Sequence, residues 1–93
     1  MERATFFVRG RVQGVGFRWW TGSQARELGL VGFARNLPDG GVEVCAQGER
    51  SRVERLESLL REQPSSTGRP GWVDSVTARW SVAGDDLRSF SER

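Results

Sequence analysis

Two kinds of hydrophobic spacing follow one another along the chain, and their order limits the folds that it can adopt. Apolar residues recur at every second position in some segments, as in strands with one buried face, and at helical spacing in others. Strand spacing is found at 5–12, 31–37, 42–46 and 76–82, and helical spacing at 17–28 and from Ser51 to Pro64. The predicted order of elements is therefore β-α-β-β-α-β.

This order is the split βαβ, or ferredoxin-like, pattern of an α+β protein. We expect an antiparallel sheet that carries both helices on one face. The turn residues at 84–86 predict a short fifth strand around 87–91. The other face of such a sheet can meet water. Charged strand residues fit this open face, namely Arg9, Arg11, Arg35 and Glu43.

Local signals support the boundaries of both helices. Gly29 follows the first helical segment and can adopt the left-handed conformation that ends many helices. Ser51 and Glu54 have the spacing of a capping box, in which both side chains bind free backbone amides of the first turn. The segment 63–71 is rich in Pro, Gly and Ser, which predicts a loop.

The residue types present exclude several kinds of chemistry. The chain has 93 residues, a length that predicts a single domain over residues 1–93. It contains one Cys and no His, Lys or Tyr. A zinc site of the usual ligands, a Ser-His-Asp triad, Schiff-base chemistry and a lysine-bearing phosphate loop are therefore excluded. Polar chemistry is left to Arg, Asp, Glu, Ser, Thr, Gln and the single Asn36.

The charge pattern argues against nucleic-acid and membrane partners. The formal net charge is +2, and the 14 basic residues are interspersed with 12 acidic ones, so no basic stripe can follow a phosphate backbone. No apolar run reaches the roughly 18 residues of a membrane span, and no signal peptide is evident. We expect a cytoplasmic protein, and the free thiol of Cys45 fits a reducing compartment.

The junction between the first strand and the first helix, Gly10–Arg18, is the strongest candidate site. Its glycines let successive N–H groups point into one concavity, and the helix N-terminus adds free amides and the positive end of its dipole. The planar guanidinium of Arg18 can close over an anion held there. A glycine-rich turn followed by a solvated arginine is the alternative. The spacing matches neither the dinucleotide nor the Walker pattern.

Two stretches, GRVQGVGFR at 10–18 and GFARNLPDGGVEVCAQG at 32–48, resemble the signatures of the acylphosphatase family. The resemblance implies a hydrolase of acyl phosphates that uses no metal and no cofactor. It implies that Arg18 binds phosphate and that Asn36 positions the attacking water. It also implies that phosphate is bound by the backbone amides of Gln13, Gly14, Val15, Gly16 and Phe17. Taken alone, Asn36 is also a common residue type before a turn such as the one at Pro38.

This small set of polar groups suffices for such a reaction. The leaving group is a carboxylate whose conjugate acid has a pKa of about 4, so no general acid is required. The reaction needs stabilisation of the phosphoryl oxygens and alignment of water with the breaking bond. Arg18 and the loop amides can supply the first, and the Asn36 side-chain amide can orient water.

Neighbours of these motifs lead to further expectations. Trp19 and Trp20 either line the rim of the site or pack under the loop, and packing is favoured because indoles usually lie at least half-buried. Leu37 offers no hydroxyl to the site. Cys45 lies two residues after Glu43 in the same predicted strand and therefore on the same open face of the sheet. This position predicts a partly exposed structural thiol without a catalytic role.

Other functions are compatible with the same fold. An RNA-binding module would present aromatic residues on the open face of the sheet, but Phe7 is the one evident candidate and Glu43 occupies the strand where further aromatics are expected. A phosphate-binding regulatory domain would have no use for Asn36. Acylphosphatase-like domains also occur in larger carbamoyl-transfer enzymes, for which 93 residues are few. We expect a monomeric acylphosphatase that acts on a small-molecule acyl phosphate.

Overall fold

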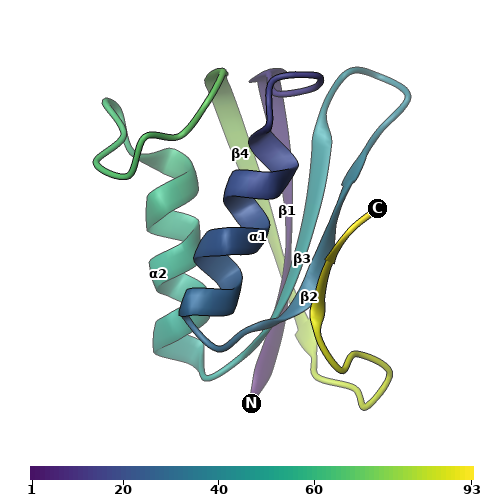
Figure 1. Ribbon diagram of the computed structural model, residues 1–93. Helices are drawn as coiled ribbons and strands as arrows, with labels where there is room; N and C mark the ends of the chain where they lie inside the picture. The colour runs from purple at the N-terminus through teal and green to yellow at the C-terminus, as the bar shows by residue number, and fades with distance from the viewer.

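The computed structural model describes residues 1–93 and has the predicted order of elements. One sheet contains β1 (Glu2–Arg11), β2 (Val31–Asn36), β3 (Val42–Gly48), β4 (Trp72–Val82) and β5 (Phe90–Glu92). Helices α1 (Phe17–Glu27) and α2 (Arg50–Arg61) lie side by side on one face of this sheet (Figure 1). The ferredoxin-like fold class is confirmed, and the short fifth strand is present at 90–92 rather than around 87–91.

The strand order in the sheet is β4-β1-β3-β2-β5. Because β3 is antiparallel to both β1 and β2, those two strands run parallel to each other with β3 between them. β5 pairs in parallel with β2. The sheet is therefore mixed where the sequence predicts an antiparallel one. The physical reason is that β4 runs antiparallel to β1, and the turn after β4 reverses the chain once more.

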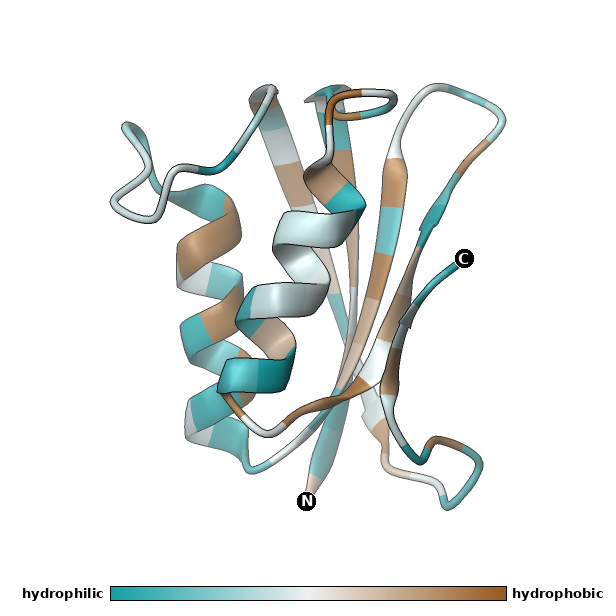
Figure 2. Cartoon of the chain, in the orientation of Figure 1, coloured by the Kyte–Doolittle hydropathy of each residue, from teal (hydrophilic) through white to brown (hydrophobic).

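The hydrophobic core lies between the sheet and the two helices. Alternate residues of β1 point into it, among them the fully buried Ala4, Phe6 and Val8. Figure 2 shows hydrophobic and hydrophilic residues alternating along the strands, and both kinds of residue along α2. The helices bury Phe17, Trp20, Thr21, Ala25, Val53, Leu56, Leu59 and Leu60. Neither helix has the length and apolar character needed to cross a membrane.

Helix α2 begins at Arg50 rather than Ser51, and the predicted capping box is wrong. The N-cap is Glu49, and no side chain caps the first turn. The backbone oxygen of Glu49 accepts the first helical hydrogen bonds, so Ser51 already lies inside the helix. Glu54 pairs with Arg50 at 3.2 Å instead of binding the backbone. At the end of α1 the prediction is right, since Gly29 has a φ of 72°.

Strand β4 begins at Trp72, ahead of the predicted segment 76–82. Its register against β1 shifts at a bulge, and both Val73 and Val76 are buried. A bulge inserts an extra residue and so changes the alternation of faces. The period of two that identifies this strand in the sequence therefore starts only after the bulge.

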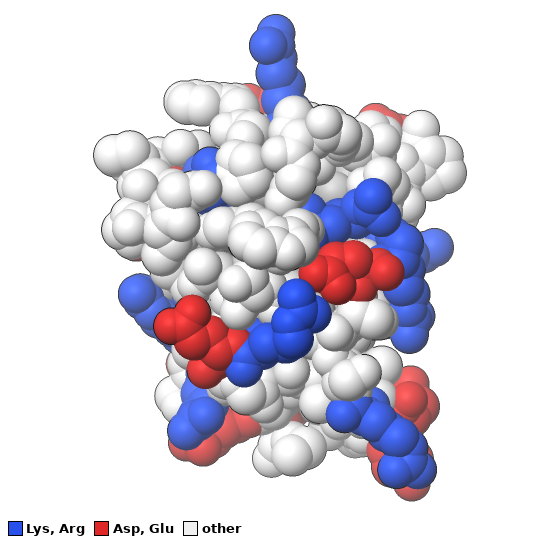
Figure 3. All heavy atoms as spheres, in the orientation of Figure 1, with Lys and Arg blue, Asp and Glu red and all other residues white.

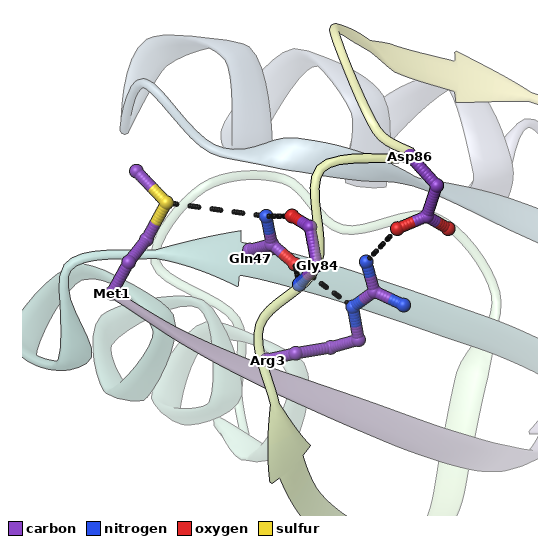
Figure 4. Close-up of polar contacts among 5 residues, drawn as sticks. All are labelled: Met1, Arg3, Gln47, Gly84 and Asp86. Carbon is purple, nitrogen blue, oxygen red and sulfur yellow. Dashed lines mark hydrogen bonds and ion pairs between the residues drawn. The ribbon is translucent and has the colours of Figure 1, made fainter.

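Cys45 is only 4% exposed, so the prediction of a partly exposed thiol is wrong. β3 is the middle strand of the sheet, and the connection between β4 and β5 covers part of the open face beside it (Figure 4). Burial raises the pKa of the Cys45 thiol. A thiol of raised pKa stays protonated near neutral pH and is a poor nucleophile.

Gln47 ties this connection to the sheet. It is 3% exposed. Its Oε1 accepts hydrogen bonds from the Gly84 N–H (3.0 Å) and from Arg3 Nε (2.9 Å), and its Nε2 donates to Gly84 O at 2.7 Å (Figure 4). Arg3 also donates to Asp86 at 2.6 Å, which holds the pKa of that carboxyl below its usual range. The donor and acceptor of the buried amide are thus both satisfied.

Replacement of Gln47 by Leu is expected to lower the free energy of unfolding by about 2 kcal/mol, because the backbone groups of Gly84 lose their partner in a part-buried position. Denaturant-induced unfolding measures this change. Gln24→Leu is the matched control, since Gln24 is half-buried on α1 and its replacement is expected to shift stability by less than about 0.5 kcal/mol. A Gln47→Leu variant as stable as the wild type would contradict the assigned role.

Candidate active site

The loop 12–16 joins β1 to α1 and has the backbone geometry expected of an anion cradle. Gly14 and Gly16 have φ values of 72° and 88°, in the left-handed region that favours glycine. A Cβ added at either position would meet no atom within 4 Å. Glycine is therefore required by the backbone conformation and not by a lack of space.

The N-terminus of α1 is open toward a ligand. Gly16 is the N-cap, and no side chain caps the helix. The Trp20 N–H donates to Gly16 O at 3.0 Å, so the amides before it in the first turn have no partner within the helix. Free N–H groups and the positive end of the helix dipole favour an anion at this place.

Arg18 lines a surface hollow of about 380 Å³ beside this loop. The hollow is lined by Val12, Gly14, Gly16, Phe17, Arg18, Trp19 and Glu92. Arg18 Nη1 donates to the backbone oxygen of Arg93 at 2.5 Å, which anchors the guanidinium near the end of β5. The guanidinium has further N–H donors in a planar fork that suits phosphate oxygens.

Glu92 is the negative charge in this hollow, and no motif in the sequence indicates its role there. Arg26 of α1 donates to its carboxylate at 3.0 Å and holds the pKa of Glu92 below its usual range. Glu92 is therefore ionised at neutral pH, with Arg26 as its partner in the ion pair. Arg18 is not a member of this ion pair. No local pattern marks this pair, because its members lie 66 residues apart.

Asn36 lies at the carboxyl end of β2, opposite Val42 of β3, and its side chain is exposed. Because β1 and β2 run parallel, their carboxyl ends lie at the same edge of the sheet. The loop 12–16 and the turn after β2 come together at this edge (Figure 1). Asn36 itself is not among the residues that line the hollow beside Arg18.

The turn between β2 and β3 is held together without the side chain of Asn36. The Leu37 N–H donates to Gly41 O at 2.8 Å, and the Gly41 N–H donates to Asp39 Oδ1 at 2.9 Å. The bond from Gly41, together with the nearby Arg9, holds the pKa of Asp39 below its usual range. These contacts weaken the alternative in which Asn36 only shapes the turn.

Gln13 joins the loop to this turn. Its Nε2 donates to Leu37 O and to Gly41 O, both at 2.8 Å. One side chain thus fixes the loop 12–16 to both ends of the turn that follows Asn36. The family resemblance implies a role for the backbone amide of Gln13 only. Its side-chain role has no local signal, since the acceptors lie 24 and 28 residues further along the chain.

The structure brings part of the predicted set into one hollow. The members that line it are Gly14, Gly16, Phe17 and Arg18. The members that lie outside its lining are Gln13, Val15 and Asn36. Trp20 is 3% exposed and packs as predicted, whereas Trp19 is 69% exposed and the packing prediction is wrong for it. Helical spacing is the reason, because Trp20 shares the core face with Phe17 while Trp19 points away from it.

The fold is that of a small ferredoxin-like protein, and the loop 12–16 with the start of α1 has the geometry expected of an anion-binding site. Residues 4–91 match the family model described as Acylphosphatase. An acylphosphatase of Mycobacterium sp. (strain JLS) is 56% identical over 91 residues, covering 98% of this chain and 93% of the relative.

Solved structures agree with this match. An acylphosphatase from Bacillus subtilis has a TM-score of 0.86 at 27% identity, covering 100% of this chain and 99% of that one. An acylphosphatase from Coxiella burnetii has a TM-score of 0.84 at 34% identity, covering 99% and 92%. The chain belongs to the acylphosphatase family. Its activity is the hydrolysis of the carboxyl-phosphate bond of a small-molecule acyl phosphate, as the two sequence signatures imply.

Gln13→Glu is expected to lower kcat by up to about 100-fold, because small displacements of reacting groups cost this much. The substitution keeps the size of the side chain but removes the N–H donor, so the loop loses its bonds to the turn. Steady-state hydrolysis of an acyl phosphate measures the loss.

Gln63→Glu is the matched control for this experiment. Gln63 Nε2 also donates to a backbone oxygen, that of Val73 at 2.7 Å, but it lies outside the site. Its replacement is expected to lower stability and leave kcat of the folded protein unchanged. Equal kcat values for Gln13→Glu and Gln63→Glu would show that the Gln13 contacts do not position the site.

Proposed function

We propose that Arg18, the backbone amides of residues 13–17 and Asn36 carry out the hydrolysis by direct attack of water on phosphorus. Water forms the new P–O bond as the bond to the acyl oxygen breaks. The electron pair of that bond leaves with the carboxylate, and one water proton passes to a phosphoryl oxygen. The products are a carboxylate and inorganic phosphate.

Phosphate is bound in the hollow beside Arg18 in this proposal. The free amides at the start of α1 and the guanidinium of Arg18 approach the hollow from the helix, and the dipole of α1 adds to their effect. Preorganised donors of this kind stabilise charge on the phosphoryl oxygens and need no rearrangement during the reaction. The anchoring of Arg18 on the Arg93 backbone oxygen, at 2.5 Å, supports such preorganisation.

Asn36 orients the attacking water in this proposal. The observation that carries this assignment is the parallel alignment of β1 and β2. It brings the exposed Asn36 to the edge of the sheet where the loop 12–16 also lies. Its side-chain amide can donate to one phosphoryl oxygen while its carbonyl accepts from water. The two hydrogen bonds from Gln13, both at 2.8 Å, fix the position of the loop 12–16 relative to the turn after Asn36.

The proposed reaction uses neither a general acid nor a metal ion. The carboxylate leaves without a proton, because its conjugate acid has a pKa of about 4. The charge on the phosphoryl group is met by Arg18 and the amides. The chain brings no three metal-ligating side chains together. A chelator such as EDTA is accordingly expected to leave the rate unchanged.

Arg18→Ala and Asn36→Ala are each expected to lower kcat/KM for benzoyl phosphate by about 100- to 1,000-fold, the cost of losing one group that stabilises the transition state. The assay contains EDTA, and thermal unfolding shows whether each variant is folded. Arg35→Ala is the control, because Arg35 is an exposed arginine next to Asn36 that pairs with Glu43. The proposal is wrong if the folded Arg18 or Asn36 variant retains wild-type turnover, or if EDTA abolishes it.

We further propose that residues 1–93 form a single domain that acts as a monomer in the cytoplasm. One cluster of 19 buried hydrophobic residues takes members from every strand and both helices, which supports a single domain. The free thiol of Cys45 suits a reducing compartment. Sedimentation is expected to give a mass near 10.4 kDa, and cell fractionation to give a cytoplasmic protein. A dimer mass or a secreted protein would contradict these expectations.

A further inference from the structure

A second hollow of about 470 Å³ adjoins the hollow beside Arg18. It lies between the N-terminal half of α1 and the loop 62–71 that follows α2. The two hollows share Gly16 and Trp19 as lining residues. A molecule with phosphate beside Arg18 can therefore extend past these two residues into the second hollow.

Trp19 stands at the boundary between the two hollows with 69% of its surface exposed. The neighbouring Trp20 is buried, packs on Phe17 with ring centroids 5.6 Å apart, and donates to Thr67 Oγ1 at 3.1 Å. Trp20 therefore has a structural role that Trp19 lacks. Val15 also lines the second hollow and is 45% exposed. Exposed apolar groups that converge on a hollow beside an active site are typical of ligand-binding surfaces.

The second hollow carries no charged side chain. Its polar groups are neutral, among them Ser23, Gln24 and Thr67, whereas the first hollow contains Arg18 and Glu92. Figure 3 shows that the surface over the start of α1 and the neighbouring loop is made mostly of uncharged atoms. A negatively charged group would find no counter-charge here, while an apolar group would be removed from water.

The loop that forms the far wall is firmly attached. Arg69 Nη1 donates to Leu59 O at 3.0 Å and to Leu60 O at 2.8 Å, so it caps the C-terminus of α2. The contact between Trp20 and Thr67 ties the same loop to α1. A wall that is already ordered costs little entropy when a ligand binds against it.

We propose that the second hollow binds the acyl group of the substrate, with the Trp19 indole as its platform, and that it selects uncharged aromatic or bulky apolar acyl groups. This inference rests on the proposed function, because it needs phosphate beside Arg18. Stacking of an aromatic acyl group on the indole, in an offset or edge-to-face arrangement, adds to the burial of apolar surface. An acetyl group is too short to gain from this surface.

The kinetic test compares benzoyl phosphate with acetyl phosphate. In Trp19→Ala the ratio of kcat/KM for benzoyl phosphate to that for acetyl phosphate is expected to fall about tenfold, a usual size of discrimination by an apolar pocket. Trp19→Phe is expected to keep most of the ratio. Trp72→Ala is the matched control, since Trp72 is 58% exposed on β4 and lines neither hollow. Its ratio should equal that of the wild type.

Ser23→Glu is a second variant that introduces a negative charge into the hollow and leaves both indoles in place. It is also expected to lower the ratio. An unchanged ratio in Trp19→Ala and in Ser23→Glu would overturn the inference, as would an equal fall in Trp72→Ala.

A binding experiment separates this inference from the proposed function. Phenacylphosphonate and acetonylphosphonate carry a methylene in place of the bridging oxygen and are not hydrolysed. Calorimetry is expected to show tighter binding of phenacylphosphonate to the wild type, and loss of this preference in Trp19→Ala. That result together with full turnover by Arg18→Ala would reject the proposed function and keep the acyl subsite. Loss of turnover in Arg18→Ala without any preference for phenacylphosphonate would keep the proposed function and reject the acyl subsite.

Discussion

The placement of β3 between β1 and β2 is the constraint on which the rest of the structure depends. Antiparallel pairing on both sides of β3 forces β1 and β2 to run in the same direction. Their carboxyl ends therefore lie at one edge of the sheet, and the segments that follow them meet there. The loop 12–16 and Asn36 are distant in the sequence. Backbone hydrogen bonding alone brings both to that edge.

Side chains then convert this rough proximity into a defined geometry. The two hydrogen bonds from Gln13, both at 2.8 Å, connect the loop 12–16 to the turn after Asn36. Arg26 pairs with Glu92 within the hollow, and the Arg18 guanidinium is held near the end of β5 by its bond to the Arg93 backbone oxygen. The candidate site thus depends on hydrogen bonds between the elements that border it, and these bonds restrict the motion of the groups proposed to act together.

Much of the fold could be predicted from hydrophobic spacing, and the errors have identifiable causes. The order of elements, both helices and the αL residue Gly29 followed from local patterns. The parallel pairing of β5 with β2 did not, because strand direction at the edge depends on the path of the whole chain. The burial of Cys45 was missed for a related reason, since the connection that covers the sheet near Gln47 comes from a distant part of the sequence.

The sequence by itself determined the chemistry available to this protein. The absence of His, Lys and Tyr, the glycines before α1 and the two signatures limited the function to a reaction that arginine, amides and asparagine can perform. The tertiary structure decided the surroundings of that chemistry, namely the Glu92–Arg26 pair, the Gln13 bonds, and the outward position of Trp19 beside the buried Trp20. These features join residues far apart in the chain or depend on which helix face meets the core, and packing against the rest of the molecule settles both.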